Sequence, residues 1–162
     1  MFRFIAVLVV FCHSYLPSFG QTAPDFTFTD INGTVHNLQH ALDQNYIILV
    51  EFFFADCGPC ITAATELEDI HEDYAGKNVL VWAISDIDDN ERIVQFHEEM
   101  GLGFISGGVE GGGIEVLDLF AQSNSFVAYP TVAVICPKSE LTWVIYPYSM
   151  GEPEWRSAIE KC

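Results

Sequence analysis

Basic residues are scarce in this sequence. The 162 residues include 6 Lys and Arg against 23 Asp and Glu, which gives a formal net charge of −17. Nucleic acids and anionic membrane surfaces are bound through clustered positive charge, so the composition argues against both as partners. The acidic residues are scattered along the chain, which favours a solvated surface over a dedicated docking site for cations or proteins.

Long hydrophobic runs are lacking as well. The apolar stretch Phe4–Phe11 is far shorter than the roughly 20 residues that a membrane-spanning helix needs. It follows the basic residue Arg3 and precedes the small residues Ser18 and Gly20, a pattern typical of a secretory signal peptide. We therefore expect a cleaved signal peptide at 1–20, one mature domain at 21–162, no stable membrane insertion after cleavage, and a periplasmic or secreted protein.

A lipid anchor on Cys12 is the competing interpretation of the N-terminus. The bulky Phe11 stands before it, where a small residue would be expected. Cleavage after residue 20 would leave four cysteines, an even number that fits an oxidising or redox-managed compartment. These four are Cys57, Cys60, Cys136 and Cys162.

The sequence also lacks a complete metal or nucleotide motif. A structural zinc site would need a second Cys/His pair, and no such spacing occurs among His71, His97, Cys136 and Cys162. Asp86, Asp88 and Asn90 begin like a calcium loop but lack the glycine at its sixth position. The glycine-rich segment 107–113 has neither the Lys-Ser/Thr of a phosphate loop nor dinucleotide-binding spacing. We therefore expect no bound metal or cofactor.

A Cys-Gly-Pro-Cys motif at 57–60 is the most informative feature that is present. It follows the apolar run 46–54, which predicts a buried strand leading into a helix. Two thiols at this spacing on a first helical turn lie on one face and can form a disulfide. The partial positive charge of the helix N-terminus favours the Cys57 thiolate. The pattern indicates dithiol-disulfide chemistry more than a metal site or a structural bridge.

The order of elements predicts a three-layer α/β sandwich with a mixed β-sheet and helices on both faces. The expected strands are 26–29 and 34–36, a hairpin turning at Asn32-Gly33, then 46–54, 79–85, 104–105, and a second hairpin of 131–136 and 141–146. The expected helices are 38–42, the motif to about 74, 89–100 with Asp88 or Asp89 as N-cap, 114–121 and 154–161. The segment 107–113 is expected to be a flexible connection or a mobile flap beside the motif.

Three stretches of sequence resemble the thioredoxin-like superfamily, specifically its exported bacterial thiol-disulfide oxidoreductases of the redoxin branch. They are 23–26 (APDF), 50–60 (VEFFFADCGPC) and 129–131 (YPT). The resemblance implies an enzyme that exchanges disulfides with protein thiols and disulfides and is recycled by an upstream thiol donor or acceptor. It implies that Cys57 is the nucleophile and Cys60 the resolving thiol. It also implies that Pro130 is cis and packs against the disulfide, with the Tyr129 backbone pairing with the substrate.

Glu51 lies six residues before Cys57, where this family often has a buried acid beneath the active site. Burial without a partner would raise its pKa toward neutrality. Glu51 could then take the proton of Cys60 during resolution. The alternative is an acid that points outward from an edge strand.

Asp56 departs from the family, which usually has Trp immediately before the first cysteine. A carboxylate there opposes the Cys57 thiolate and would shift the couple toward reducing behaviour. Asp56 could equally cap the following helix. We group it with Gly58 and Pro59 as residues that modulate the active site.

The family topology also implies a structural disulfide between Cys136 and Cys162, at the end of the domain opposite the motif. Two unpaired thiols are the alternative. For the activity, two alternatives to thiol-disulfide exchange stay open. A peroxidase would need Pro-x-x-x-Thr-x-x-Cys, and 50–57 contains neither Pro nor Thr. A redox-inactive adaptor would use the motif as a structural bridge, and burial of both sulfurs would favour it.

Overall fold

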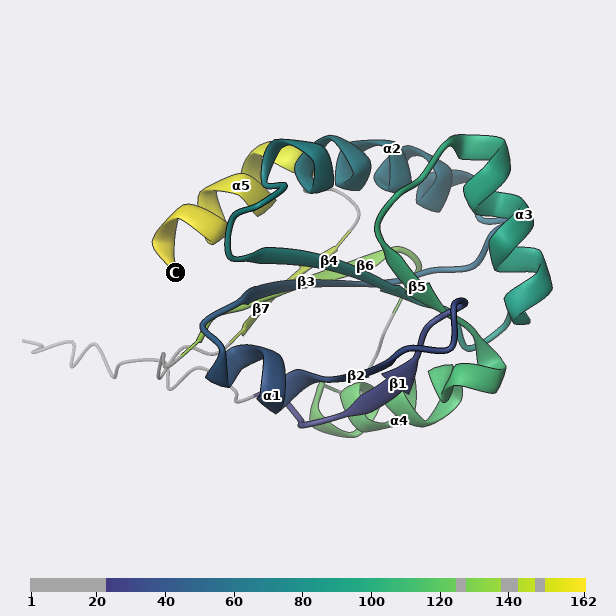
Figure 1. Ribbon diagram of the computed structural model, residues 1–162, viewed down its shortest axis with the longest axis horizontal. Coiled ribbons are helices and arrows are strands. Elements are labelled where there is room, and N and C mark those ends of the chain that lie inside the picture. Colours follow the sequence, from purple (N-terminus) through teal and green to yellow (C-terminus); the bar gives the residue numbers. More distant parts are fainter. Residues whose placement is uncertain (1–22, 125–127, 138–142, 148–150) are drawn as a thin grey trace, which may run out of the picture.

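The computed structural model describes residues 23–124, 128–137, 143–147 and 151–162. A mixed five-stranded sheet lies between two layers of helices, and a small two-stranded hairpin lies beside the lower layer (Figure 1). The predicted three-layer α/β sandwich is confirmed. The signal peptide predicted at 1–20 and the start of the strand predicted at 141–146 lie outside the described residues.

The helices and strands follow the predicted order closely. The strands are β1 (Thr27–Thr29), β2 (Val35–Asn37), β3 (Ile47–Phe52), β4 (Val79–Ile84), β5 (Ile105–Gly107), β6 (Thr131–Ile135) and β7 (Trp143–Pro147). The helices are α1 (Leu38–Asp43), α2 (Gly58–Asp73), α3 (Asn90–Met100), α4 (Gly113–Asn124) and α5 (Glu152–Lys161), with a 3-10 turn η1 (Val109–Gly111). The strand expected at 104–105 lies at 105–107, because Phe104 turns into the core beneath α2 and α3.

The sheet has the strand order β5-β4-β3-β6-β7, with β3, β4 and β5 parallel and β6 and β7 antiparallel to their neighbours. The central strand β3 is covered on both faces, as its continuous apolar run predicts. Leu49 packs into the core formed with α2, α3 and α5, whereas Ile48 and Val50 pack into the core formed with α1, α4 and the hairpin.

Strand register brings four connecting segments to one edge of the sheet. Phe52 of β3 pairs with Ile84 of β4 and with Thr131 of β6, and Ile84 pairs with Gly107 of β5. The segments that follow β3, β4 and β5, and the one that precedes β6, therefore meet at this edge. The Cys-Gly-Pro-Cys motif lies in the first of them.

The prediction for the glycine-rich segment 107–113 is wrong. The segment reaches the same edge as the motif, as predicted, but it is neither a flexible connection nor a flap. A Cβ at Gly111 would collide with the carbonyl oxygen of Thr29, and one at Gly113 would collide with that of Ser85. The glycines therefore let η1 and the start of α4 pack directly on the backbone of β1 and the end of β4.

Candidate active site

The paired cysteines occupy the N-terminus of α2, as predicted. Cys57 is the N-cap residue, and its Sγ accepts a hydrogen bond from the backbone N–H of Cys60 at 3.2 Å. The two residues form a disulfide with a Cα–Cα distance of 5.1 Å. Gly58 and Pro59 form the first turn between them and are exposed. Proline is well suited to this turn because the backbone N–H it lacks would have no helical partner there.

The two sulfur-bearing residues differ slightly in exposure. Cys57 is 5% exposed and Cys60 is 0% exposed in the disulfide form. Both are therefore buried, and by the criterion set from the sequence this favours a structural bridge. The order of exposure is the one that an exchange reaction needs, since the more exposed cysteine is the nucleophile expected from the sequence.

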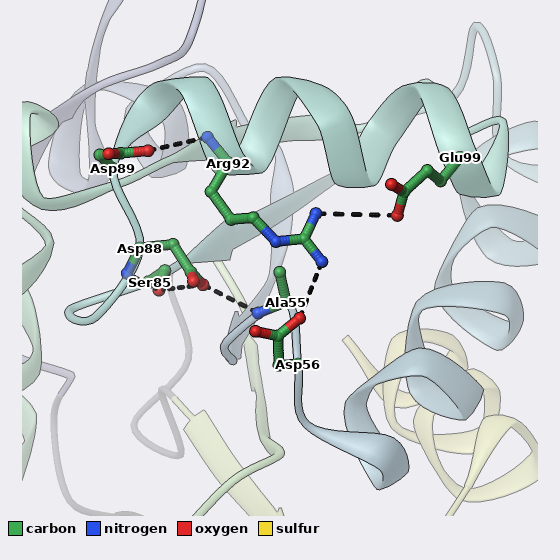
Figure 2. A network of polar contacts seen from close by, with 7 residues as sticks. All are labelled: Ala55, Asp56, Ser85, Asp88, Asp89, Arg92 and Glu99. Atoms are coloured by element: carbon green, nitrogen blue, oxygen red, sulfur yellow. Dashed lines mark hydrogen bonds and ion pairs between the residues drawn. The ribbon is translucent and has the colours of Figure 1, made fainter.

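Asp56 does not cap α2, because Cys57 does. Its exposed carboxylate instead accepts a hydrogen bond from Arg92 on α3, with 2.9 Å between Asp56 Oδ1 and Arg92 Nη2 (Figure 2). Sequence reasoning missed Arg92. The available signal was a positive residue in the first turn of a predicted helix, where the helix dipole disfavours it.

The loop between β4 and α3 holds the segment before the motif from a second direction. Asp88 Oδ2 accepts hydrogen bonds from the Ala55 backbone N–H at 2.8 Å and from the Ser85 hydroxyl at 2.9 Å (Figure 2). Asp89 is the N-cap of α3, with its Oδ1 accepting the Arg92 backbone N–H. The calcium-like start of this loop is thus a strand-to-helix turn.

Glu51 is only 1% exposed and lies near the carboxyl end of β3. Ile48, Val50 and Phe52 of β3 pack into the core on the α1 and α4 side of the sheet. Because side chains alternate along a strand, Glu51 faces the α2 side. Neither carboxyl oxygen has a hydrogen-bond partner among the described residues. Burial raises the pKa of the Glu51 carboxyl well above its ordinary value. A buried carboxyl without a polar partner among the described residues therefore lies on the sheet face that carries the paired cysteines.

Tyr129 and Pro130 precede β6 at the same edge. The peptide bond between them is cis, as the family resemblance implies. The Tyr129 hydroxyl donates a hydrogen bond to Asp86 Oδ1 at 2.5 Å. The rings of Tyr129 and Phe54 pack edge to face, with 5.3 Å between their centroids. Burial, reinforced by the hydrogen bond to Asp86, raises the pKa of the Tyr129 phenol. These contacts connect the loops of β3, β4 and β6.

Cys136 and Cys162 are joined at the opposite edge of the sheet. They form a disulfide with a Cα–Cα distance of 5.2 Å and a sequence separation of 26. Ile135 pairs with Ile48 near the start of β3, which places Cys136 far from the motif. This bridge ties the end of β6 to the end of α5.

Within the described part of the chain, no group of three or more His, Cys, Asp or Glu side chains could hold a metal ion. No helix within the same ranges is both long and apolar enough to cross a membrane.

Solved structures share this architecture. The thioredoxin domain of a thiol-disulfide oxidoreductase from Bacteroides vulgatus has a TM-score of 0.71 and 21% identity, covering 89% of this chain and 96% of that chain. A thiol:disulfide interchange protein from Bacteroides sp. has a TM-score of 0.69 and 20% identity, covering 88% of each chain. A secreted Mycobacterium tuberculosis disulfide oxidoreductase homologous to Escherichia coli DsbE has a TM-score of 0.65 and 18% identity, covering 85% of this chain and 96% of that chain.

At identities this low, the structural similarity establishes the fold. Together with the motif at the end of β3, this fold defines a thioredoxin-like protein of the redoxin branch. The AhpC/TSA family matches residues 19–144, and the chain belongs to that family. A comparison with curated protein sequences found no match.

Proposed function

We propose that this protein is a thiol-disulfide oxidoreductase that exchanges disulfides with other proteins outside the cytoplasm. The observation that supports it best is the Cys57–Cys60 disulfide at the N-terminus of α2, with the more exposed cysteine at the helix end. The helix dipole and the first-turn N–H groups favour a thiolate there once the bond is reduced.

The reaction consists of two thiol-disulfide exchanges. In the reducing direction, the Cys57 thiolate attacks one sulfur of a substrate disulfide, forms a mixed disulfide and expels the other substrate sulfur as a thiolate. Cys60 then attacks Cys57 Sγ, which releases the second substrate thiolate and closes the Cys57–Cys60 bond. Two electrons pass to the substrate, so a thiol donor must reduce the disulfide again. The reverse sequence oxidises a substrate dithiol.

Glu51 supplies the proton transfer in this proposal. Cys60 must lose its proton before it attacks, and it is 0% exposed, so water has little access to it. An unpartnered carboxylate with a raised pKa is a stronger base than an ordinary one, and on the same face of the sheet it is suited to accept that proton. Cys57 needs less help because it lies at the helix end.

Tyr129 and Pro130 form the substrate side of the site in this proposal. The Tyr129 backbone would pair with an extended substrate segment, as in the family this chain resembles. The Tyr129 side chain is held by Asp86 and Phe54, which fixes the loop beside the disulfide. Export is supported by the predicted signal peptide at 1–20 and by the secreted relative from Mycobacterium tuberculosis.

Reduction of insulin disulfides tests the proposal. Cys57→Ser should abolish the reaction, whereas Cys60→Ser should accumulate a mixed disulfide with the substrate because only the second exchange is lost. Full activity of the Cys57→Ser chain would refute the assignment of the nucleophile.

A non-catalytic adaptor is the second candidate function, and burial of both cysteines is the observation that favours it. An adaptor would show no insulin reduction and would keep its partner binding in the Cys57→Ser/Cys60→Ser chain. The oxidoreductase would lose turnover in the same chain.

A peroxidase is the other alternative activity left open by the sequence. Its motif places Pro and Thr at the positions of Val50 and Phe54. Val50 is buried in the β3 core, and the Phe54 ring packs on Tyr129, so no hydroxyl is available at that position. We therefore do not propose peroxide reduction.

A further inference from the structure

Arg92 occupies an electrostatically unfavourable place in its own helix. It is the third residue of α3, counted after the N-cap Asp89, and its backbone N–H is bonded to that cap at 2.8 Å. A positive side chain in a first turn is disfavoured by the helix dipole. Since the chain has only 6 basic residues, the placement of one here suggests a role outside α3.

The contacts of Arg92 point to that role. Its Nη2 donates to Asp56 Oδ1 at 2.9 Å, and its Nη1 lies 3.7 Å from Glu99 Oε2 (Figure 2). Within the described part of the chain, Nη1 is buried and has no hydrogen bond. The Arg92 side chain is 28% exposed, whereas that of Asp56 is 82% exposed. The more buried partner is therefore the guanidinium, which holds the carboxylate in place.

Asp56 would have an alternative position without this contact. It immediately precedes Cys57, the N-cap of α2, and the first-turn N–H groups of α2 attract a carboxylate. A carboxylate that moved toward those groups would approach the sulfur and oppose its ionisation. Asp88 holds only the backbone of this segment, through the Ala55 N–H, and leaves the Asp56 side chain free to rotate.

We propose that Arg92 is a positioning residue that holds the Asp56 carboxylate against α3 and so keeps its charge from opposing the Cys57 thiolate. This inference rests on the proposed thiol-disulfide exchange and adds a residue that sets the reactivity of its nucleophile. Arg92 acts through Asp56 and contributes no atom to the reaction.

Other ionisable groups lie around this edge, and of those named here Glu99 is the one that contacts Arg92. Glu51 is buried in β3, Asp88 is bonded to Ala55 and Ser85, and Asp86 is bonded to Tyr129. Glu99 lies on α3 beyond the guanidinium. A double-mutant cycle on Arg92 and Asp56 leaves all of them in place, so their effects cancel. The groups that stay constant are Glu51, Asp86, Asp88, Glu99 and Tyr129.

The cycle uses the full chain with Cys12→Ser and Cys60→Ser, so that Cys57 is the free thiol that titrates while Cys136 and Cys162 are bridged. Arg92→Gln, Asp56→Asn and the double substitution are compared by the pH dependence of thiolate absorbance. With Asp56 present, Arg92→Gln should lower the thiolate fraction about three- to tenfold at a pH below the pKa of the Cys57 thiol. With Asn at position 56, Arg92→Gln should change that fraction by less than about twofold.

Two control variants accompany the cycle. Arg156→Gln removes an arginine that is 25% exposed and pairs with Asp73 and Glu152, at the end of α2 opposite the motif. It should leave the thiolate titration unchanged. Arg92→Lys keeps the charge and should restore most of the thiolate fraction, even if Arg92→Gln loosens α3.

An equal effect of Arg92→Gln in both Asp56 backgrounds would overturn the proposal, since Arg92 would then act directly on Cys57. No effect in either background would overturn it as well. The titration needs no substrate, so it is independent of the insulin assay. Failure of insulin reduction with an intact cycle would count against the proposed function and leave the role of Arg92 standing.

Discussion

The Tyr129 hydroxyl donates a hydrogen bond to the Asp86 carboxylate, which ties the loop before β6 to the loop after β4. Both loops flank the disulfide because Phe52 pairs with Ile84 and with Thr131. The architecture of the edge therefore depends on side-chain contacts between loops as well as on the sheet.

Tyr129→Phe removes this hydrogen bond and keeps the ring against Phe54. We expect a loss of about 1 kcal/mol in the free energy of unfolding, the usual net worth of one hydrogen bond. The apparent KM for a protein disulfide should rise more than kcat falls, because the loop shapes substrate binding. Urea unfolding and insulin kinetics measure the two effects. An unchanged KM would argue against Tyr129 as part of the substrate site.

Glu51→Ala should slow the second exchange more than the first. The carboxyl is proposed to take the proton of Cys60, whereas Cys57 is activated by the end of α2. Stopped-flow traces separate formation of the mixed disulfide from its resolution. Glu51→Gln keeps the side-chain shape and should show the same defect. If attack and resolution slow to the same extent, Glu51 has no specific role in resolution.

The ionised Glu51 carboxylate should also destabilise the folded protein at neutral pH. Its folded-state pKa is raised by burial, so the folded protein holds this proton more tightly than the unfolded chain does. The favourable contribution is present below the unfolded pKa of about 4.5 and is lost as pH rises through the folded pKa. Glu51→Gln, which cannot ionise, should therefore stabilise the folded protein more at pH 7 than at pH 4. A gain that grows on acidification would contradict this assignment.

Gly113→Ala should destabilise the fold by about 1 to 3 kcal/mol, since the new methyl group would collide with the Ser85 carbonyl oxygen. Gly58→Ala is the matched control, because a Cβ there meets no atom within 4 Å. Thermal unfolding of the two variants compares the sites directly. Similar melting temperatures would mean that the glycine-rich segment is not packed as described.

Most of the fold could be predicted from local sequence signals. The apolar run at 46–54 predicted the central strand. The helix predicted at 89–100 ends as expected, with Gly101 as its C-cap at a φ of 71°. The glycine-rich segment was misjudged because flexibility and close backbone packing both favour glycine. Only the positions of Thr29 and Ser85 distinguish them.

The candidate site divides in the same way. Cys57 and Cys60 could be located by their spacing after a buried strand, and Glu51 by its position before Cys57 in the family that the chain resembles. The contacts of Arg92 and Asp88 join residues 36 and 33 positions apart, so they depend on the β4–α3 loop reaching the motif. No local pattern encodes that approach. The capping role considered for Asp56 belongs to Cys57.

The Cys136–Cys162 bridge should stabilise the domain without taking part in exchange. It closes a loop with a sequence separation of 26, for which chain entropy gives about 3 kcal/mol. Thiol counting on the denatured, non-reduced mature chain (21–162) with Cys57→Ser and Cys60→Ser should detect no free thiol. Two free thiols in that chain would exclude the bridge.

The reduction potential of the Cys57–Cys60 couple, measured in native protein equilibrated with thiol redox buffers, tests the exchange function most directly. We predict a reversible two-electron equilibrium in the folded chain at a potential above about −300 mV, since structural disulfides typically lie below that value. The Cys136→Ser/Cys162→Ser chain should give the same equilibrium. A Cys57–Cys60 bond that opens only when the protein unfolds would contradict the exchange function and support the adaptor.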